Sequence, residues 1–170
     1  KPCALIEFLA GISIDEPAPA QARAVGIALA DLHRAAADFP QSRASSLSIP
    51  VCVEMLRDNA GRFDEIDLSL ARTIPDCGTG VLERWPADLP EGTIHSDLFP
   101  DNVLFVDDAV TGLIDFYFAC SGIFAYDLAV THAAWSFDLA DNAFRPDIGR
   151  ALIEGYESRR TLSDAERAAL

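Results

Sequence analysis

Four polar residues in one stretch of the chain combine side-chain types that perform acid–base chemistry and bind metal ions. They are His95, Asp97, Asn102 and Asp115. Asp97 is the candidate to aim an acceptor hydroxyl and accept its proton, because a carboxylate on a rigid loop suits both tasks. Mg²⁺ prefers oxygen ligands, and Asn102 offers an amide oxygen while Asp115 offers an anionic one. Single Asp and Asn residues are typical of turns, but this set predicts phosphoryl transfer assisted by Mg²⁺.

Two predicted strands connect the candidate metal ligands. Residues 103–106 (VLFV) form a short apolar run, residues 107–109 favour a turn, and residues 110–115 form a second apolar run. Two such runs joined by a short polar turn predict a β-hairpin. Because Asn102 precedes the first strand and Asp115 ends the second, both side chains are expected at the same end of this hairpin.

Apolar positions at intervals of three and four residues predict that most of the remaining chain is helical. Between Ala20 and Ala37 the positions Val25, Leu29, Leu32 and Ala36 form an apolar stripe, which is typical of an amphipathic helix. Further helices are predicted from Pro50 through Leu56, over residues 62–73 and 79–85, from Tyr126 to Phe137, from Pro146 to Glu157 and from Leu162 onward. The expected fold class is therefore α+β and mostly helical, with a small β-hairpin that carries the site.

The segments between these elements have less regular patterns. Residues 3–9 (CALIEFL) predict a buried strand that ends at Gly11, and residues 116–124 predict an aromatic-rich loop. His33 ends the apolar stripe of its predicted helix and is interpreted as a residue at the edge of the core, and His132 is interpreted as a core residue of its helix.

Composition and charge narrow the class of protein. The chain has 170 residues, 50% of them hydrophobic, and no run of eighteen apolar residues, so we expect one globular domain without a membrane span or a signal peptide. A net charge of −14 argues against nucleic acid as a partner, whereas Mg²⁺ can still bridge carboxylates to ATP. No C-x-x-C pair occurs, and the cysteines are interpreted as buried thiols of a cytoplasmic protein: Cys3, Cys52, Cys77 and Cys120.

Three longer motifs resemble one known family. HSDLFPDNVLF (95–105), GLIDFYFAC (112–120) and AYDLAV (125–130) are similar to the catalytic and metal loops of the protein-kinase-like fold. They resemble most the aminoglycoside phosphotransferase and choline kinase branch, and within it the homoserine kinases. The resemblance implies ATP as co-substrate, Mg²⁺ as cofactor and the side-chain hydroxyl of L-homoserine as acceptor, in the route to threonine.

The resemblance also implies roles for the residues of the site. Asp97 corresponds to the catalytic base, and Asn102 and Asp115 correspond to the Mg²⁺ ligands. His95 corresponds to a residue whose ring supports the metal loop. Asp127 corresponds to a buried acid that accepts hydrogen bonds from backbone N–H groups, either of its own helix or of the catalytic loop.

The nucleotide pocket follows from the same resemblance. Glu7 and Leu9 are expected in a hinge segment whose backbone meets the adenine edge. Leu104 and Ile114 are expected to form the apolar floor beneath the adenine ring.

The acceptor pocket is harder to assign from the sequence. Tyr117 and Trp135 are candidates for it, with the core as their alternative location. A carboxylate-bearing acceptor calls for an arginine in the pocket, and the arginines considered were Arg57, Arg62, Arg145 and Arg150. An aminoglycoside, choline or another small alcohol remains the alternative acceptor.

The resemblance covers the larger, C-terminal lobe of the kinase-like fold, with the N-terminal lobe absent. Residues 1–12 are interpreted as the hinge strand and turn, and residues 13–170 as the helical lobe, with the catalytic loop at 93–102 and the metal-loop hairpin at 102–118. The chain is expected to be incomplete at both ends and inactive by itself, because it contains no glycine-rich phosphate loop and no matching strand lysine. A non-catalytic relic is the remaining alternative.

Overall fold

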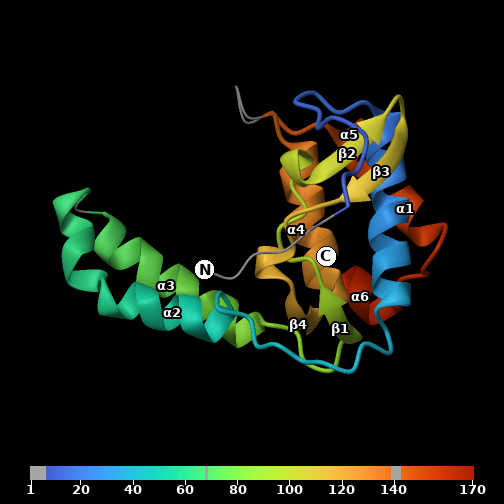
Figure 1. The fold of residues 1–170 in the computed structure, drawn as a ribbon. Helices are drawn as coiled ribbons and strands as arrows, with labels where there is room; N and C mark the ends of the chain where they lie inside the picture. The colour runs from blue at the N-terminus through green and yellow to red at the C-terminus, as the bar shows by residue number, and fades with distance from the viewer. Residues whose placement is uncertain (1–6, 68, 139–142) are drawn as a thin grey trace. The chain divides into compact units, whose positions relative to one another are not determined.

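The computed structural model describes residues 7–67, 69–138 and 143–170 (Figure 1). Contacts divide the chain into two compact units. Unit 1 consists of residues 1–43 and 89–170, and unit 2 consists of residues 44–88. Unit 1 therefore contains every residue predicted for the catalytic and metal-binding site.

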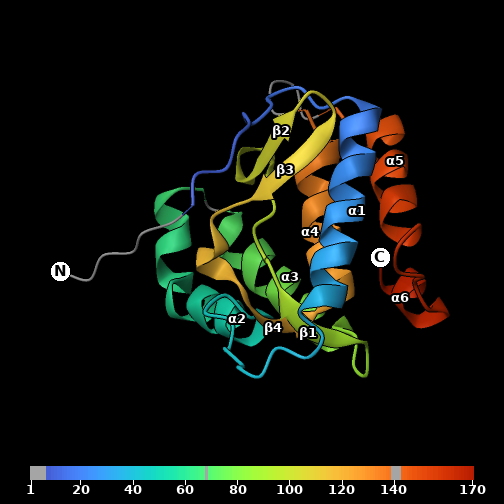
Figure 2. The ribbon, with the colours of Figure 1, turned by 45° about the vertical axis from the view of Figure 1, so that its right-hand side comes forward.

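Three helices form the core of unit 1 and lie side by side in both ribbon views (Figures 1 and 2). They are α1 (Pro19–Ala35), α4 (Phe124–Ser136) and α5 (Pro146–Glu157). Their shared core is fully buried and aliphatic or aromatic, and it includes Ala22, Val25, Leu29, Leu128, Ile148, Leu152 and Tyr156. The three helices were predicted from the apolar periodicity, and their existence is confirmed to within a few residues at each end.

Two glycines allow α1 and α5 to approach closely. A Cβ atom at Gly26 would overlap the backbone carbonyl of Leu152, and one at Gly155 would overlap the carbonyl of Arg23. Because backbone lies directly opposite both positions, the helix pair has no room for a larger residue there.

A short helix, α6 (Asp164–Ala169), follows α5 and begins with a capping box. The Ser163 hydroxyl accepts from the Glu166 backbone N–H at 3.2 Å, and the Glu166 carboxylate accepts from the Ser163 N–H at 2.9 Å. This helix was predicted to start near Leu162, and its presence is confirmed.

The predicted hairpin is present as β2 (Val103–Val106) and β3 (Ala109–Leu113), which pair antiparallel. The second strand ends at Leu113, two residues earlier than predicted, because Asp115 takes a left-handed backbone conformation. The turn between the strands also holds a left-handed residue, Asp107 at φ 53°.

A second antiparallel pair was not predicted. It joins β1 (Glu91–Ile94) to β4 (Cys120–Ile123), in segments that overlap the predicted catalytic loop (93–102) and the predicted aromatic-rich loop (116–124). Gly92 lies opposite Gly122 in this pair. Glycine weakens the strand signal of both segments, and their ladder is fixed by pairing between distant parts of the chain.

The first described residues contradict the prediction of a buried strand. Residues 7–11 have no regular secondary structure, and Phe8 is 89% exposed. The segment instead runs along the hairpin: Thr111 donates to the Ala10 carbonyl at 2.5 Å, and Ile12 exchanges two backbone hydrogen bonds with Phe105. The remainder of the predicted strand, residues 3–6, lies outside the described residues.

Unit 2 contains α2 (Ile49–Asp58), the 3₁₀ helix η1 (Ala60–Glu65) and α3 (Leu70–Arg84). The prediction of separate helices at 62–73 and 79–85 was wrong, because one helix runs from Leu70 through position 75. A proline inside a helix costs one backbone hydrogen bond and normally weakens it. Packing between α2 and α3 maintains the helix here, and the two share an apolar groove lined by Val53, Leu56, Ile74, Gly78 and Val81 among others.

The cysteines differ from their predicted burial. Cys120 is buried, but Cys52 is half-buried and Cys77 is exposed. Both of the latter line the groove of unit 2, so their environment is apolar although open. Cys3 lies outside the described residues.

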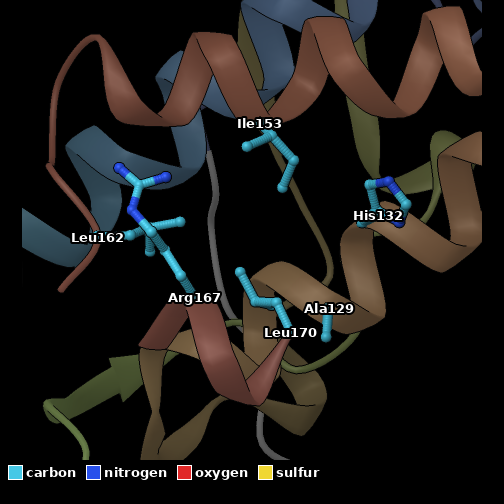
Figure 3. Close-up of a pocket in the computed structure, with 6 residues that line it drawn as sticks. All are labelled: Ala129, His132, Ile153, Leu162, Arg167 and Leu170. Carbon is cyan, nitrogen blue, oxygen red and sulfur yellow. The ribbon is translucent and has the colours of Figure 1, made fainter. Parts of the chain in front are cut away.

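A cavity of about 390 Å³ lies in unit 1 among α4, α5 and α6 (Figure 3). Its lining is mostly apolar and comprises Ala129, His132, Ile153, Leu162, Arg167 and Leu170. His132 was predicted as a core residue but is only half-buried, and burial lowers the pKa of its ring below the usual value. None of the predicted site residues lines this cavity. Among the described residues, no helix is long and apolar enough to cross a membrane.

Candidate active site

The predicted catalytic loop connects β1 to β2 and folds back on itself. The Phe99 N–H donates to the Asp97 carbonyl at 2.9 Å, and the Asn102 N–H donates to the Phe99 carbonyl at 3.0 Å. Pro100 starts a short 3₁₀ turn, Pro100–Asn102, that leads directly into β2. These local bonds fix the spacing between Asp97 and Asn102.

The Asn102 side chain closes the loop. Its Nδ2 donates to the Asp97 backbone carbonyl at 2.7 Å and lies 3.4 Å from the Asp97 carboxylate. Because the amide nitrogen is used within the loop, the amide oxygen is the Asn102 atom left to ligate a cation. The side chain is buried, which holds this orientation.

Asp115 lies next to Asn102 across the hairpin. The Ile114 N–H donates to the Asn102 carbonyl at 3.0 Å, which joins the ends of the two predicted metal-ligand segments. Asp115 is exposed and has φ 60°, and Ser96 beside Asp97 has φ 67°. Left-handed non-glycine residues are strained and often occur at functional sites; here one is Asp115 itself and the other directly precedes Asp97.

His95 fastens the catalytic loop to the predicted metal loop. Its Nε2 donates to the Ile114 carbonyl at 3.0 Å, and its ring lies 4.6 Å from the ring of Phe116. A carbonyl can only accept, so Nε2 carries the hydrogen in this tautomer. The ring is fully buried, and it is placed to brace the segment that carries Asp115.

Asp127, at the start of α4, holds the other side of the loop. Its Oδ2 accepts from the His95 N–H at 2.8 Å, and its Oδ1 accepts from the Ser96 N–H at 2.7 Å. Of the two sets of N–H groups considered from the sequence, Asp127 therefore binds those of the catalytic loop. The carboxylate is fully buried, so these bonds are shielded from water.

Sequence reasoning missed a chain of buried hydrogen bonds behind Asp127. His33 Nε2 lies 3.0 Å from Asp127 Oδ2, and His33 Nδ1 lies 2.8 Å from the Tyr156 hydroxyl. The carboxylate accepts, so Nε2 donates to it and Nδ1 accepts from Tyr156. Arg160 donates to the Tyr156 oxygen at 3.2 Å and pairs with Glu166 at 2.8 Å.

This series of buried hydrogen bonds and one ion pair connects the catalytic loop, through residues of α4, α1 and α5, to α6. Burial raises the pKa of Tyr156 to about 12, which keeps its hydroxyl protonated and able to donate. From the sequence, His33 was interpreted only as a residue at the edge of the core, but it is fully buried. Its position on the apolar stripe of α1 gave no sign that a carboxylate and a phenol lay opposite.

The electrostatics of Asp97 suit a proton acceptor. Desolvation is the largest cause that raises the pKa of Asp97 above its ordinary value, and the negative charges of Asp101 and Asp115 add to the effect. His95 and the hydrogen bond from Asn102 oppose it. A raised pKa makes a carboxylate a better base.

The residues predicted for the nucleotide pocket lie around the hairpin. Glu7 is exposed, and Leu9 lies against β3, where its side chain fills the space beside Gly112. Leu104 and Ile114 are half-buried on the hairpin and its end. The structure therefore gathers Leu9, Leu104 and Ile114 at the hairpin, whereas Glu7 has no recorded side-chain contact within the described part of the chain.

The two acceptor-pocket candidates have opposite environments. Tyr117 is 71% exposed in the 3₁₀ helix η3 (Phe116–Phe118) that follows Asp115. Trp135 is 1% exposed, packs against Phe105 and donates to the Leu98 carbonyl at 2.9 Å. The pocket interpretation of Trp135 was wrong, because its indole is sealed in the core and supports the catalytic loop from behind.

The donor set fits a hard divalent cation. The described residues contain no group of three or more His, Cys, Asp or Glu side chains that could hold a metal ion. Asn102 and Asp115 offer two oxygens at one end of the hairpin, which is the small share of ligands that Mg²⁺ takes from a protein when substrate phosphates supply others.

The amino-acid sequence matches the model of the Phosphotransferase enzyme family over residues 1–162. The match covers nearly the whole chain, and the chain belongs to this family.

Curated relatives narrow the resemblance. Homoserine kinases of Methylobacterium radiotolerans, Phenylobacterium zucineum and Rhizobium meliloti are 48%, 47% and 43% identical over 172, 173 and 170 residues. Each match covers 100% of this chain but only 53%, 52% and 52% of the respective relative. The resemblance to homoserine kinases is confirmed, and the chain spans about half the length of these relatives.

Solved structures share the fold. An aminoglycoside-3'-phosphotransferase of type VIII matches with TM-score 0.63 and 24% identity, covering 96% of this chain and 64% of that one. A Plasmodium vivax ethanolamine kinase matches with TM-score 0.61 and 19% identity, covering 96% and 52%. An amicoumacin kinase in complex with AMP-PNP, Ca²⁺ and Ami matches with TM-score 0.64 and 15% identity, covering 94% and 49%. Likeness at these identities concerns the fold alone, and it agrees with the kinase-like fold predicted from the catalytic motifs.

Proposed function

We propose that this chain forms the catalytic and metal-binding part of an ATP-dependent kinase that phosphorylates the side-chain hydroxyl of L-homoserine. The observation that carries the proposal is the closed loop in which Asn102 holds Asp97 through its side chain and accepts, through its carbonyl, from the N–H of Ile114, the residue before Asp115. The choice of L-homoserine rests on the homoserine kinases that match the whole chain.

Asp97 acts as the base in this mechanism. Its carboxylate hydrogen-bonds the acceptor hydroxyl, orients the oxygen towards the γ-phosphorus of ATP and takes the proton as the new O–P bond forms. The bond from the γ-phosphorus to the bridging oxygen breaks, and ADP leaves. The raised pKa of Asp97 favours this proton transfer.

Asn102 and Asp115 hold Mg²⁺ in this proposal. The bound ion supplies positive charge that neutralises the phosphate oxygens. His95 and Asp127 do not touch the reactants; they position the loop through the Ile114 carbonyl and through the N–H groups of His95 and Ser96. Leu9, Leu104 and Ile114 offer apolar surface for the adenine ring.

A coupled assay of ADP release tests the proposal. The protein expressed from its complete reading frame is incubated with ATP and Mg²⁺, and with L-homoserine, choline or kanamycin as acceptor. We expect turnover with L-homoserine and background rates with the other two. Turnover with choline or kanamycin alone would assign a different acceptor to the same phosphotransfer site, and turnover with none of them would contradict the proposed function.

A further inference from the structure

Arg43 is attached to the loop that follows Asp115. Its backbone N–H donates to the Ser121 hydroxyl at 3.2 Å, and its carbonyl accepts from the Ser121 N–H at 2.8 Å. The guanidinium Nη1 donates to the Tyr117 carbonyl at 2.8 Å. Residues 43 and 117–121 all belong to unit 1, so both the backbone and the side chain of Arg43 have a defined place beside the candidate active site.

Within the described residues, one hydrogen bond is formed by the Arg43 guanidinium, which leaves most of its donors available. It carries five N–H groups in a planar fork, and one of them serves the Tyr117 carbonyl. In the part of the chain that the structure describes, no carboxylate is recorded within ion-pair distance of Arg43. Five other arginines do have such partners: Arg34, Arg62, Arg159, Arg160 and Arg167.

The candidate site near Arg43 is strongly acidic. The site holds three carboxylates, Asp97, Asp101 and Asp115, and the chain carries a net charge of −14. An acceptor with a carboxylate of its own would be repelled by this set unless a cation met it. Arg43 is the arginine whose side chain bonds to the 116–118 loop in the described structure.

The reach of the side chain is compatible with a small amino-acid acceptor. Tyr117 follows Asp115 by two peptide units, which span at most about 7.6 Å between Cα atoms. In L-homoserine three carbons separate the hydroxyl oxygen from the carboxyl carbon, so its carboxylate lies no more than about 6 Å from the reacting oxygen. A carboxylate bound by Arg43 would thus accompany a hydroxyl presented near Asp97 and Asp115.

We propose that Arg43 binds the carboxylate of the acceptor and thereby selects an amino acid over amino alcohols and aminoglycosides. This inference rests on the proposed function, since it concerns the acceptor of the same phosphotransfer. A guanidinium fork binds a carboxylate through two parallel hydrogen bonds, a geometry that an ammonium group cannot reproduce. None of the four arginines considered from the sequence is Arg43.

A pair of acceptors isolates this role. 3-Aminopropan-1-ol is L-homoserine without the carboxylate, so it retains the reacting hydroxyl and the amine. In the protein from the complete reading frame, we expect Arg43→Met to raise the KM for L-homoserine by about 10- to 100-fold. The kcat/KM for 3-aminopropan-1-ol and the KM for ATP should stay within about twofold, because neither substrate has the carboxylate. Arg43→Lys should recover only part of the lost affinity.

Two control variants separate this role from simple loop fastening. Ser121→Ala removes a backbone anchor of Arg43 but leaves its guanidinium, and Arg150→Met removes a positive charge from the exposed side of α5. Both should leave the KM for L-homoserine within about twofold of the unmodified protein. If Arg43→Met lowered turnover of both acceptors equally, Arg43 would only fasten the loop and the inference would be overturned.

The outcomes also distinguish this inference from the proposed function. Turnover of L-homoserine by the unmodified protein with an unchanged KM in Arg43→Met would overturn the role of Arg43 and leave the function standing. No turnover of L-homoserine by the unmodified protein would overturn both. A KM increase confined to L-homoserine would support both.

Discussion

At the residue scale, the environment of Asp97 has opposite effects on chemistry and on stability. Desolvation and the neighbouring carboxylates raise the pKa of Asp97. A carboxyl whose pKa is higher in the folded than in the unfolded state makes folding less favourable once pH rises past both values. Ionised Asp97, the proposed base, is thus expected to lower the stability of the folded protein.

The first prediction concerns Asp97→Asn. This change removes the base, so we expect kcat to fall by about 10² to 10⁴, while the melting temperature at pH 7 should not decrease. In the unmodified enzyme, kcat should decline as pH falls through the raised pKa of Asp97, because the protonated acid cannot accept the hydroxyl proton. Rate profiles and thermal melts of both proteins test this. Near-normal turnover of the variant would refute the assignment.

The second prediction concerns Asp115→Ala. The loss of an anionic ligand should raise the Mg²⁺ concentration needed for half-maximal rate. Because Asp115 is exposed, its removal leaves no buried cavity and should preserve the fold. Titration of activity with Mg²⁺ measures the effect, with Asp108→Ala in the exposed hairpin turn as the matched control. An unchanged Mg²⁺ requirement would argue against Asp115 as a ligand.

At the element scale, the local signals of the sequence predicted the hairpin and loop of the candidate site better than the contacts that support them. The H-x-D-x-x-x-x-N spacing and the hairpin depend on neighbours in sequence, so the loop, β2 and β3 were predictable. The pairing of β1 with β4 depends on contacts between segments nearly 30 residues apart, and neither segment has an alternating pattern. Pro75 likewise predicted a break that packing of α3 against α2 overrides. The contacts of His33 with Asp127 and Tyr156 join three helices and have no local sequence signal.

The third prediction tests the hydrogen bonds that join His33 to Asp127 and Tyr156. His33→Ala removes a buried donor to Asp127 and an acceptor from Tyr156. We expect the free energy of unfolding to fall by roughly 1–3 kcal/mol, because two buried polar groups each lose one hydrogen-bond partner. His33→Gln retains an amide N–H and should recover part of it. Urea unfolding measures both variants, and His132→Ala serves as the control for losing a histidine that has no recorded hydrogen bond to the described residues.

The fourth prediction tests the close contact between α1 and α5. Gly26→Ala places a methyl group against the Leu152 carbonyl, and backbone cannot move aside as a flexible side chain would. We expect a loss of about 1–3 kcal/mol of unfolding free energy. Gly61→Ala is the matched control, since a Cβ there meets nothing within 4 Å. Equal stability of the two variants would show that the helices can separate without cost.

At the scale of the whole molecule, unit 1 carries the candidate acid–base residue, the candidate metal ligands and the residues that support their loops. The same unit leaves apolar side chains exposed next to the hairpin, including Phe8 and Ile12. In the kinase-like mechanism the phosphates of ATP also need a glycine-rich loop and a lysine. The 170 residues contain neither motif, and their single lysine is Lys1.

The last prediction follows from the lack of these two phosphate-binding motifs in the 170 residues. The 170-residue chain by itself should fold yet show no turnover of ATP with L-homoserine, because Asp97, Asn102 and Asp115 cannot by themselves hold the γ-phosphate in line. Exposed Phe8 should also promote self-association, which size-exclusion chromatography at several concentrations would detect. Circular dichroism establishes folding before the ADP-release assay is run, and the protein from the complete reading frame is the positive control. Turnover by the isolated chain would mean that its own residues provide the phosphate contacts. The proposed mechanism would then not require a glycine-rich loop and a lysine in addition to these 170 residues.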